Sequence, residues 1–437
     1  MHFSCLPTGL NWRASIISSL LIVKSQVNSS TIDFKQGDTI TIPKETDSIL
    51  FIDYIPLKDV IGLKESNVRY IQFICEFDGS KFESQYLPSS MDKLRLTRAS
   101  NIEVGSIPST VRILEINKHH IKPGVLPESI RNLILTGETQ FFAVPNPDIV
   151  PGVVPCGTVH LCLNQRVMPD GLIPPSVKSL VTVSLQNLPA TIESIVLVRR
   201  DQVMRIEPGQ LPPALTSLDA LSMKCELVVG SFPIGLIKLK VDSDQLLPGI
   251  IPSTVTKLTI KTYKPLLANV IPDSVTNLTL NNYGVFEHPL TSDILPSSLK
   301  KFKLKGQQRN HLYALPRLPS TLTHLTLTLS ILGAPFTAES LPATCHTLKT
   351  SKDNFLRFFS DMSIFPETLG DITIISPNNN SLVSETPEQL KIRRISKSDY
   401  LLIGDKLSSG IVNNDSLLKL LSRDKQTSQN VHRSYLE

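Results

Sequence analysis

The chain has 437 residues, more than one hydrophobic core usually encloses, so it must divide into domains or grow by repetition. Hydrophobic residues make up 41% and charged residues 19%, which supplies a packed core and excludes a disordered polyelectrolyte. The net charge of +5 is a mild basic excess, well short of the dense Lys/Arg tracts of nucleic-acid binders. We therefore expect no nucleic-acid partner.

Residues 1–86 lack a clean repeating pattern and are expected to form an N-terminal cap region with degenerate strands. The apolar run at 16–23 has the length of a signal-peptide core and is too short to span a membrane. No basic segment begins the chain and no small-residue cleavage site follows promptly, which favours a strand or short helix in the cap. Segments 51–55 and 70–74 also have strand character.

From residue 87 to 375 a proline recurs mostly every 19 to 24 residues, preceded by an apolar residue and followed six positions later by another. These prolines are Pro88, Pro108, Pro127, Pro155, Pro174, Pro189, Pro212, Pro233, Pro252, Pro272, Pro296, Pro319, Pro342 and Pro366. The long interval before Pro155 predicts a bulged loop, and the short interval before Pro189 predicts a shortened turn. The segment therefore consists of about fourteen repeats of about 20 residues.

The second half of each repeat alternates as a short strand with one buried face does. The residue six after the proline is apolar in every copy, and the residue eight after it is apolar except at Thr182 and Thr350. Seven copies have glycine three before the proline, where a positive φ allows a sharp turn, and eleven have Ser or Thr two after it, which can bond nearby backbone. Frequent proline and short repeats leave no room for return helices.

Stacking such units buries a continuous core behind a parallel sheet. The sequence predicts a repeat solenoid, leucine-rich-repeat-like, with short parallel strands, extended or 3-10 return segments and few helices. Residues 376–404 are expected to form a degenerate terminal repeat or cap, and 405–437 a polar C-terminal tail with a short amphipathic segment at 417–421.

The unit Gly-x-Ile/Leu-Pro-x-Ser-x-x-x-Leu-x-Leu resembles the FNIP repeat, a leucine-rich-type repeat of social amoebae and large amoebal viruses. The resemblance covers about two-thirds of the chain, although the Phe-Asn pair that names the family is missing. Bacterial effector leucine-rich repeats share the Leu-Pro-x-x-Leu-x-x-Leu pattern and are the rival assignment. Membership of the FNIP family implies an interaction domain, in some members attached to an F-box.

Motifs for chemistry are lacking in the sequence, so we predict no catalytic residue, no cofactor and no metal site. His119, His120 and His160 have no Asp, Glu or Cys at ligand spacing, and Cys156 and Cys162 are more typical of ordinary small residues than of a pair. The six cysteines are scattered without a CxxC pair, which favours a reducing, cytoplasmic location. We therefore expect a protein that is not an enzyme.

Two classes of function follow. The first is a protein–protein interaction scaffold that grips its partner on the sheet face, including the recognition arm of a ubiquitin ligase if residues 1–86 hold an F-box-like module. The second is an extracellular carbohydrate- or surface-binding adhesion protein, which requires a cleaved N-terminus and glycan on Asn28 or Asn277. The first is favoured, and the oligomeric state stays open.

Residues five, seven and nine after the proline should face outward on the sheet side, where they predict a partner site. They comprise a basic stripe, Lys238, Lys240, Lys257, Lys261, Lys301, Lys303, Lys305 and Lys349, and an apolar patch, Val181, Val183, Val196 and Val198. The stripe predicts an acidic protein partner. The alternative is that the lysines only keep the sheet soluble and that the valines are misregistered core.

Overall fold

The structure, a computed structural model, describes residues 20–24, 32–33, 40–42, 46–51, 56–78, 84–117, 121–136, 149–198, 203–244, 246–262, 264, 266–282, 292–306, 317–328, 341–358, 367–375, 389–404, 410–417 and 419. Pro366, Asn28, His119 and His120 lie outside these residues, as does the loop predicted before Pro155. The chain forms two compact units. Unit 1 comprises Met1–Gln202 and Gly209–Met223, and unit 2 comprises Val203–Pro208 and Lys224–Glu437.

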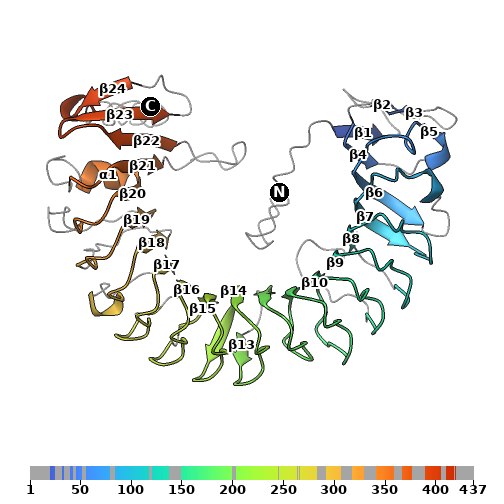
Figure 1. Cartoon of the computed structure of the whole chain (residues 1–437), viewed down its shortest axis with the longest axis horizontal. Helices are drawn as coiled ribbons and strands as arrows, with labels where there is room; N and C mark the ends of the chain where they lie inside the picture. The colour runs from blue at the N-terminus through green and yellow to red at the C-terminus, as the bar shows by residue number, and fades with distance from the viewer. Residues whose placement is uncertain are drawn as a thin grey trace, which may run out of the picture. The chain divides into compact units, whose positions relative to one another are not determined.

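Unit 1 is built on a parallel sheet (Figure 1). Its strands are β1 (Leu20–Lys24), β2 (Ile32–Asp33), β4 (Ser48–Phe51), β6 (Tyr70–Asp78), β7 (Lys93–Ser100), β8 (Ile113–Asn117), β9 (Asn132–Thr136), β10 (His160–Leu163), β11 (Ser179–Thr182), β12 (Ser194–Leu197) and the start of β14 (Ser217–Leu227). A second small sheet pairs β3 (Ile40–Thr41) with β5 (Val60–Ile61), and η1 (Leu57–Asp59) and η3 (Ser84–Tyr86) are 3-10 turns.

The parallel ladder begins earlier than the regular prolines do. Ile49 on β4 pairs with Ile71 on β6, which pairs with Leu94 on β7, and all three are fully buried. β1 overlaps the apolar run at 16–23 that was predicted as a cap strand or helix, and it pairs parallel with β4. β1, β4 and β6 therefore continue the repeat ladder into residues 1–86.

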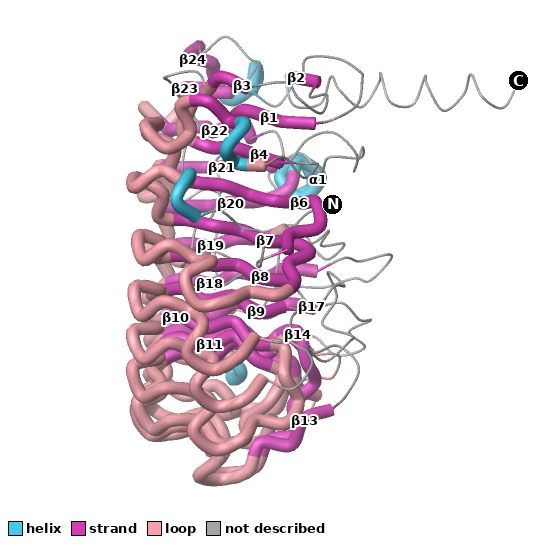
Figure 2. Tube along the Cα trace, turned by 90° about the vertical axis from the view of Figure 1, so that its right-hand side faces the viewer, coloured by secondary structure: helices cyan, strands magenta, loops and turns pink. Residues whose placement is uncertain are grey.

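Unit 2 has the same plan over its regular repeats. β13 (Val203–Ile206) pairs with the end of β14, and the parallel series continues with β15 (Lys238–Asp242), β16 (Lys257–Lys261), β17 (Asn277–Asn282), β18 (Lys301–Gly306), β19 (His324–Leu327), β20 (Thr347–Ser351) and β21 (Asp371–Ile375). A 3-10 turn, η4 (Ser292–Ile294), and one short helix, α1 (Lys352–Phe358), interrupt the return segments described there. Within each unit the strands stack on one side and the turns on the other (Figure 2).

The core is the stack of residues six after each proline. All fourteen are at most 2% exposed, from Leu94 at 0% to Ile372 at 2%. In unit 2 the parallel register aligns them strand by strand, as Leu239, Leu258 and Leu278 show. The predicted repeat solenoid with few helices is confirmed, because the strand alternation places one apolar row behind the sheet.

The turns before the prolines have the predicted geometry. Gly230 and Gly249 adopt φ values of 88° and 85°, which a side chain with a Cβ rarely adopts. The coil of Pro272 has Asn269 at the same place, with φ 60°, because asparagine tolerates the left-handed region better than other non-glycine residues. The turn is therefore conserved in shape where the glycine is absent.

For residues 376–404 the sequence left open a degenerate repeat or a cap, and the strand directions distinguish the two. β22 (Gln389–Arg394) runs antiparallel to β21, and β23 (Asp399–Gly404) and β24 (Gly410–Asn413) continue antiparallel. Residues 389–404 are thus a cap and not a further repeat, because a repeat strand would pair parallel. β24 lies within the segment predicted as a polar tail, so part of that tail belongs to the cap sheet.

Candidate partner-binding surface

The predicted basic stripe lies on the outward face of the sheet in unit 2. Lys238, Lys257, Lys301, Lys303 and Lys305 are exposed, whereas Lys240, Lys261 and Lys349 are half-buried. Each alternates with a core residue on its strand, as Lys303 does between Phe302 and Leu304. The strand register predicted from the prolines therefore directs these side chains away from the core.

The strands that carry most of the stripe lack carboxylates. β16 to β20 read KLTIK, NLTLNN, KFKLKG, HLTL and TLKTS, so no residue of these five strands is Asp or Glu. In register across them, Lys303 lies opposite Thr279 and Thr326, and Thr326 lies opposite Lys349. The face over β16 to β20 consequently has lysines among neutral hydroxyl and amide side chains.

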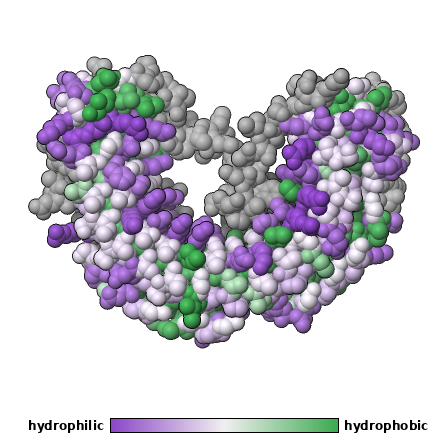
Figure 3. All heavy atoms as spheres, in the orientation of Figure 1, coloured by the Kyte–Doolittle hydropathy of each residue, from purple (hydrophilic) through white to green (hydrophobic). Residues whose placement is uncertain are grey.

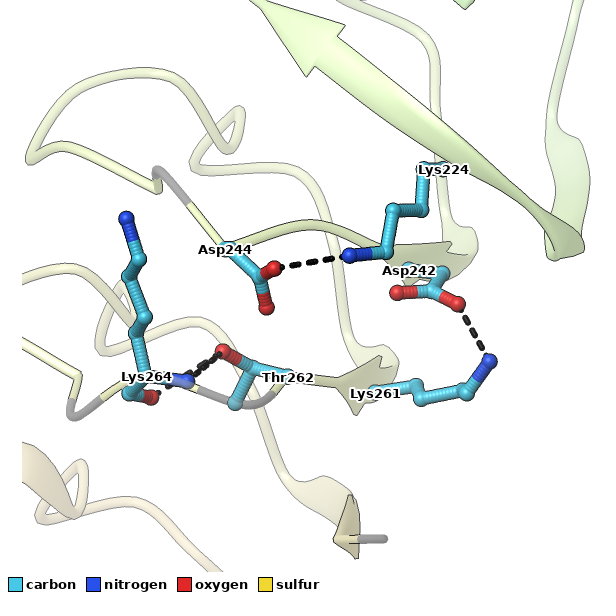
Figure 4. Close-up of polar contacts among 6 residues, drawn as sticks. All are labelled: Lys224, Asp242, Asp244, Lys261, Thr262 and Lys264. Atoms are coloured by element: carbon cyan, nitrogen blue, oxygen red, sulfur yellow. Dashed lines mark hydrogen bonds and ion pairs between the residues drawn. The ribbon is translucent and has the colours of Figure 1, made fainter. Parts of the chain in front are cut away.

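Both ends of this basic face are bounded by ion pairs. At one end Lys261 pairs with the buried Asp242, and the Lys224 Nζ lies 3.1 Å from Asp244 Oδ2 (Figure 4). Thr262 closes the next turn by bonding both the backbone N–H and the carbonyl of Lys264. Lys261, predicted as a partner-binding residue, is thus already engaged with a carboxylate in the structure.

At the other end Arg393 on β22 pairs with Asp371 on β21, with 3.0 Å between Nε and Oδ1. Hydrophilic residues gather over β22 in Figure 3. No ion pair with a described residue involves Lys301, Lys303, Lys305 or Lys349. The positive charge between the two ends is therefore not compensated by the described part of the sheet.

Like charges crowd on this face. Partial burial lowers the pKa of Lys305, and the charges of Lys303, Lys349 and Lys240 lower it further. The lysines therefore lie close enough to interact, and an added carboxylate would relieve their repulsion.

A pair of histidines adjoins the stripe and was not anticipated from the sequence. His324 and His346 meet edge to face with ring centroids 4.8 Å apart. Burial lowers the pKa of His324, with smaller contributions from Lys301 and His346. The two histidines belong to neighbouring coils, and His324 is five residues after its proline whereas His346 is four after its own. They occupy different repeat positions, so the repeat pattern does not predict the pair.

The four valines predicted as an apolar patch are not accessible. Val181, Val183, Val196 and Val198 are 5%, 3%, 8% and 4% exposed and form one cluster with Ile134 and Cys162. The alternative that the valines belong to a core agrees with their burial, but they are not misregistered, since Val181 pairs with Cys162 and Val196 in the regular register. They lie on the outward face of unit 1 and are buried there among other apolar side chains.

The described residues contain no group of three or more His, Cys, Asp and Glu side chains that could hold a metal ion. Burial raises the pKa of the Cys162 and Cys225 thiols to about 12, so both stay protonated at neutral pH. Burial also lowers the pKa of His160. None of the helices in the described residues has the length and apolar character needed to cross a membrane.

A family model and a solved structure are similar to parts of this chain. The FNIP Repeat family matches residues 243–283 and 263–307, which span β16, β17 and β18 of the basic face. Residues 243–307 are therefore similar to FNIP repeats. For these residues the match favours the FNIP resemblance over the bacterial effector repeats. No curated protein matches the chain.

A solved structure has the same fold. The crystal structure of CroV588, a circular LRR protein, is similar to the chain with a TM-score of 0.56 and 20% sequence identity. The match covers 78% of this chain and 51% of that chain, so this chain spans about half the length of the solved structure. Similarity at this identity establishes the leucine-rich-repeat-like fold alone.

Proposed function

We propose that this FNIP-repeat protein is a non-catalytic interaction scaffold that binds an acidic protein on the sheet face over β16 to β20. Five neighbouring strands without a carboxylate, carrying exposed Lys301, Lys303 and Lys305, are the observation that supports it most. Solenoids commonly use an extended sheet face for binding. Like charges gathered on one face attract an acidic partner and speed its encounter.

The proposal includes a cytoplasmic location. It is supported by Cys156, Cys162, Cys225 and Cys345, which are free thiols. Asn277, the sequon that an extracellular role would need glycosylated, stands between Lys257 and Lys301 on the sheet face. A glycan there would cover the face proposed to bind the partner.

Charge reversal tests the proposed function. Lys301→Glu, Lys303→Glu and Lys305→Glu together should leave thermal unfolding nearly unchanged, because all three side chains are exposed. Capture of the partner from source-cell extract should weaken and lose most of its salt dependence, measured by quantitative mass spectrometry at low and high salt.

The matched control reverses three exposed lysines of unit 1, Lys58→Glu, Lys64→Glu and Lys122→Glu, which changes the net charge equally. This control should capture the partner as the unmodified protein does. Equal loss in both triple variants, or undiminished capture by the β18 variant at low salt, would contradict the proposed function.

A further inference from the structure

β18 presents a straight row of three lysines. Lys301, Lys303 and Lys305 are exposed and alternate with the buried Phe302 and Leu304. Side chains two residues apart on a strand share a face and lie about 6.6–6.8 Å apart, so the row is about 13 Å long. Strand side chains stand roughly perpendicular to the sheet, so the ammonium groups follow the direction of the strand.

The strands on either side leave this row open to negative charge. Opposite Lys301 lie Asn277 on β17 and His324 on β19, and opposite Lys303 lie Thr279 and Thr326. None of these side chains is a carboxylate, and each is half-buried whereas the three lysines are exposed. Among the described residues, the row along β18 is therefore an exposed line of positive charge without a facing carboxylate.

We propose that the partner contributes an extended acidic segment with a carboxylate at every second residue, lying along β18. This inference rests on the proposed function and adds the conformation and spacing of the partner. An extended segment has the same two-residue period as β18, so its facing carboxylates stay in step with all three lysines. Each pair then forms without bending either chain.

Other acidic arrangements match the row less well. Carboxylates on one face of a helix recur about once per turn of 5.4 Å. Three of them therefore span about 10.8 Å, whereas the three lysines span about 13 Å. An extended block of consecutive acidic residues turns every second carboxylate away from the lysines, where those charges repel one another without a partner. The row of lysines should therefore bind alternating carboxylates more tightly than the same number of carboxylates in consecutive positions.

Synthetic peptides test this spacing against the full-length protein. One peptide alternates Glu with Ser, a second has the same residues with the glutamates in one block, and a third replaces Glu by Gln. Fluorescence anisotropy at low ionic strength should show the alternating peptide binding more tightly than the block by about two- to fivefold for each additional facing pair.

The outcomes separate the two proposals. Equal affinity for both acidic peptides would overturn the alternating spacing while leaving an acidic partner in place. If neither acidic peptide binds better than the neutral one, the proposed function fails as well.

A single substitution locates the effect on β18. Lys303→Gln removes the centre of the row and should reduce the preference for the alternating peptide toward equality. Lys300→Gln, the matched control, removes an exposed lysine directly before the strand and should preserve that preference. If Lys300→Gln abolishes the preference and Lys303→Gln does not, the segment does not lie along β18.

Discussion

At the level of single residues, the hydroxyl two after the proline bonds the backbone of the preceding coil in most copies that have Ser or Thr there. Ser274 Oγ donates to the carbonyl of Val255 at 2.8 Å, and Thr344 Oγ1 donates to that of Leu322 at the same distance. The sequence indicated that these hydroxyls bond nearby backbone, and the structure shows that the acceptor lies in the preceding coil. A contact between coils cannot be assigned before the stacking is known.

Removing one such hydroxyl should weaken the stack. Ser274→Ala is expected to lower the free energy of unfolding by about 1 kcal/mol, because the carbonyl of the buried Val255 loses its side-chain donor. Urea denaturation measures the change. Ser253→Ala, at an exposed position of the neighbouring coil, should alter stability by less than about 0.5 kcal/mol. Equal effects from the two substitutions would show that the bond between coils contributes nothing.

At the scale of the strand, the register determines which side chains are buried. Leu258 is 2% exposed, whereas its neighbour Thr259 is half-buried on the outward face. A shift of the register by one residue would exchange these two environments. Aspartate at each position therefore reports the register directly.

Leu258→Asp should destabilise the repeats by several kcal/mol, because an unpaired carboxylate enters the core that neighbouring coils share. Thr259→Asp should keep a near-normal melting temperature, since its carboxylate faces the lysines of the outward face. Circular dichroism melting compares the two variants. A cooperative, unshifted transition for Leu258→Asp would refute the register, as would selective loss of structure in Thr259→Asp.

The strands also show where sequence reasoning ends. Proline spacing and alternation predicted the buried rows, because those features repeat in every coil. Leu390 and Ile392 on β22 alternate as repeat residues do, yet β22 is antiparallel, since alternation carries no information on strand direction. Likewise the position of Val181 predicted an outward side chain, but its burial depends on the apolar residues beside it in other coils.

At the level of the whole molecule, the two units share one kind of repeat but present different side chains on the outward face of their sheets. Unit 1 has the buried apolar cluster around Val181 and Cys162, and unit 2 has the basic face over β16 to β20. The lysine positions of that face were predicted from the sequence. The pairing of Lys261 with Asp242 was not, because Asp242 and Lys261 belong to different repeats and meet only across β15 and β16.

Site-specific photocrosslinking tests whether the partner binds on the sheet face of unit 2. A photoreactive residue at Thr326, between Lys303 and Lys349 in the register, reports contacts on that face without altering a lysine. The same residue at the exposed Ser320, in the turn after Pro319 of the same coil, is the control. We expect the captured acidic partner to crosslink at Thr326 and not at Ser320. Crosslinking at Ser320 with none at Thr326 would show that the partner does not bind on the sheet face of unit 2.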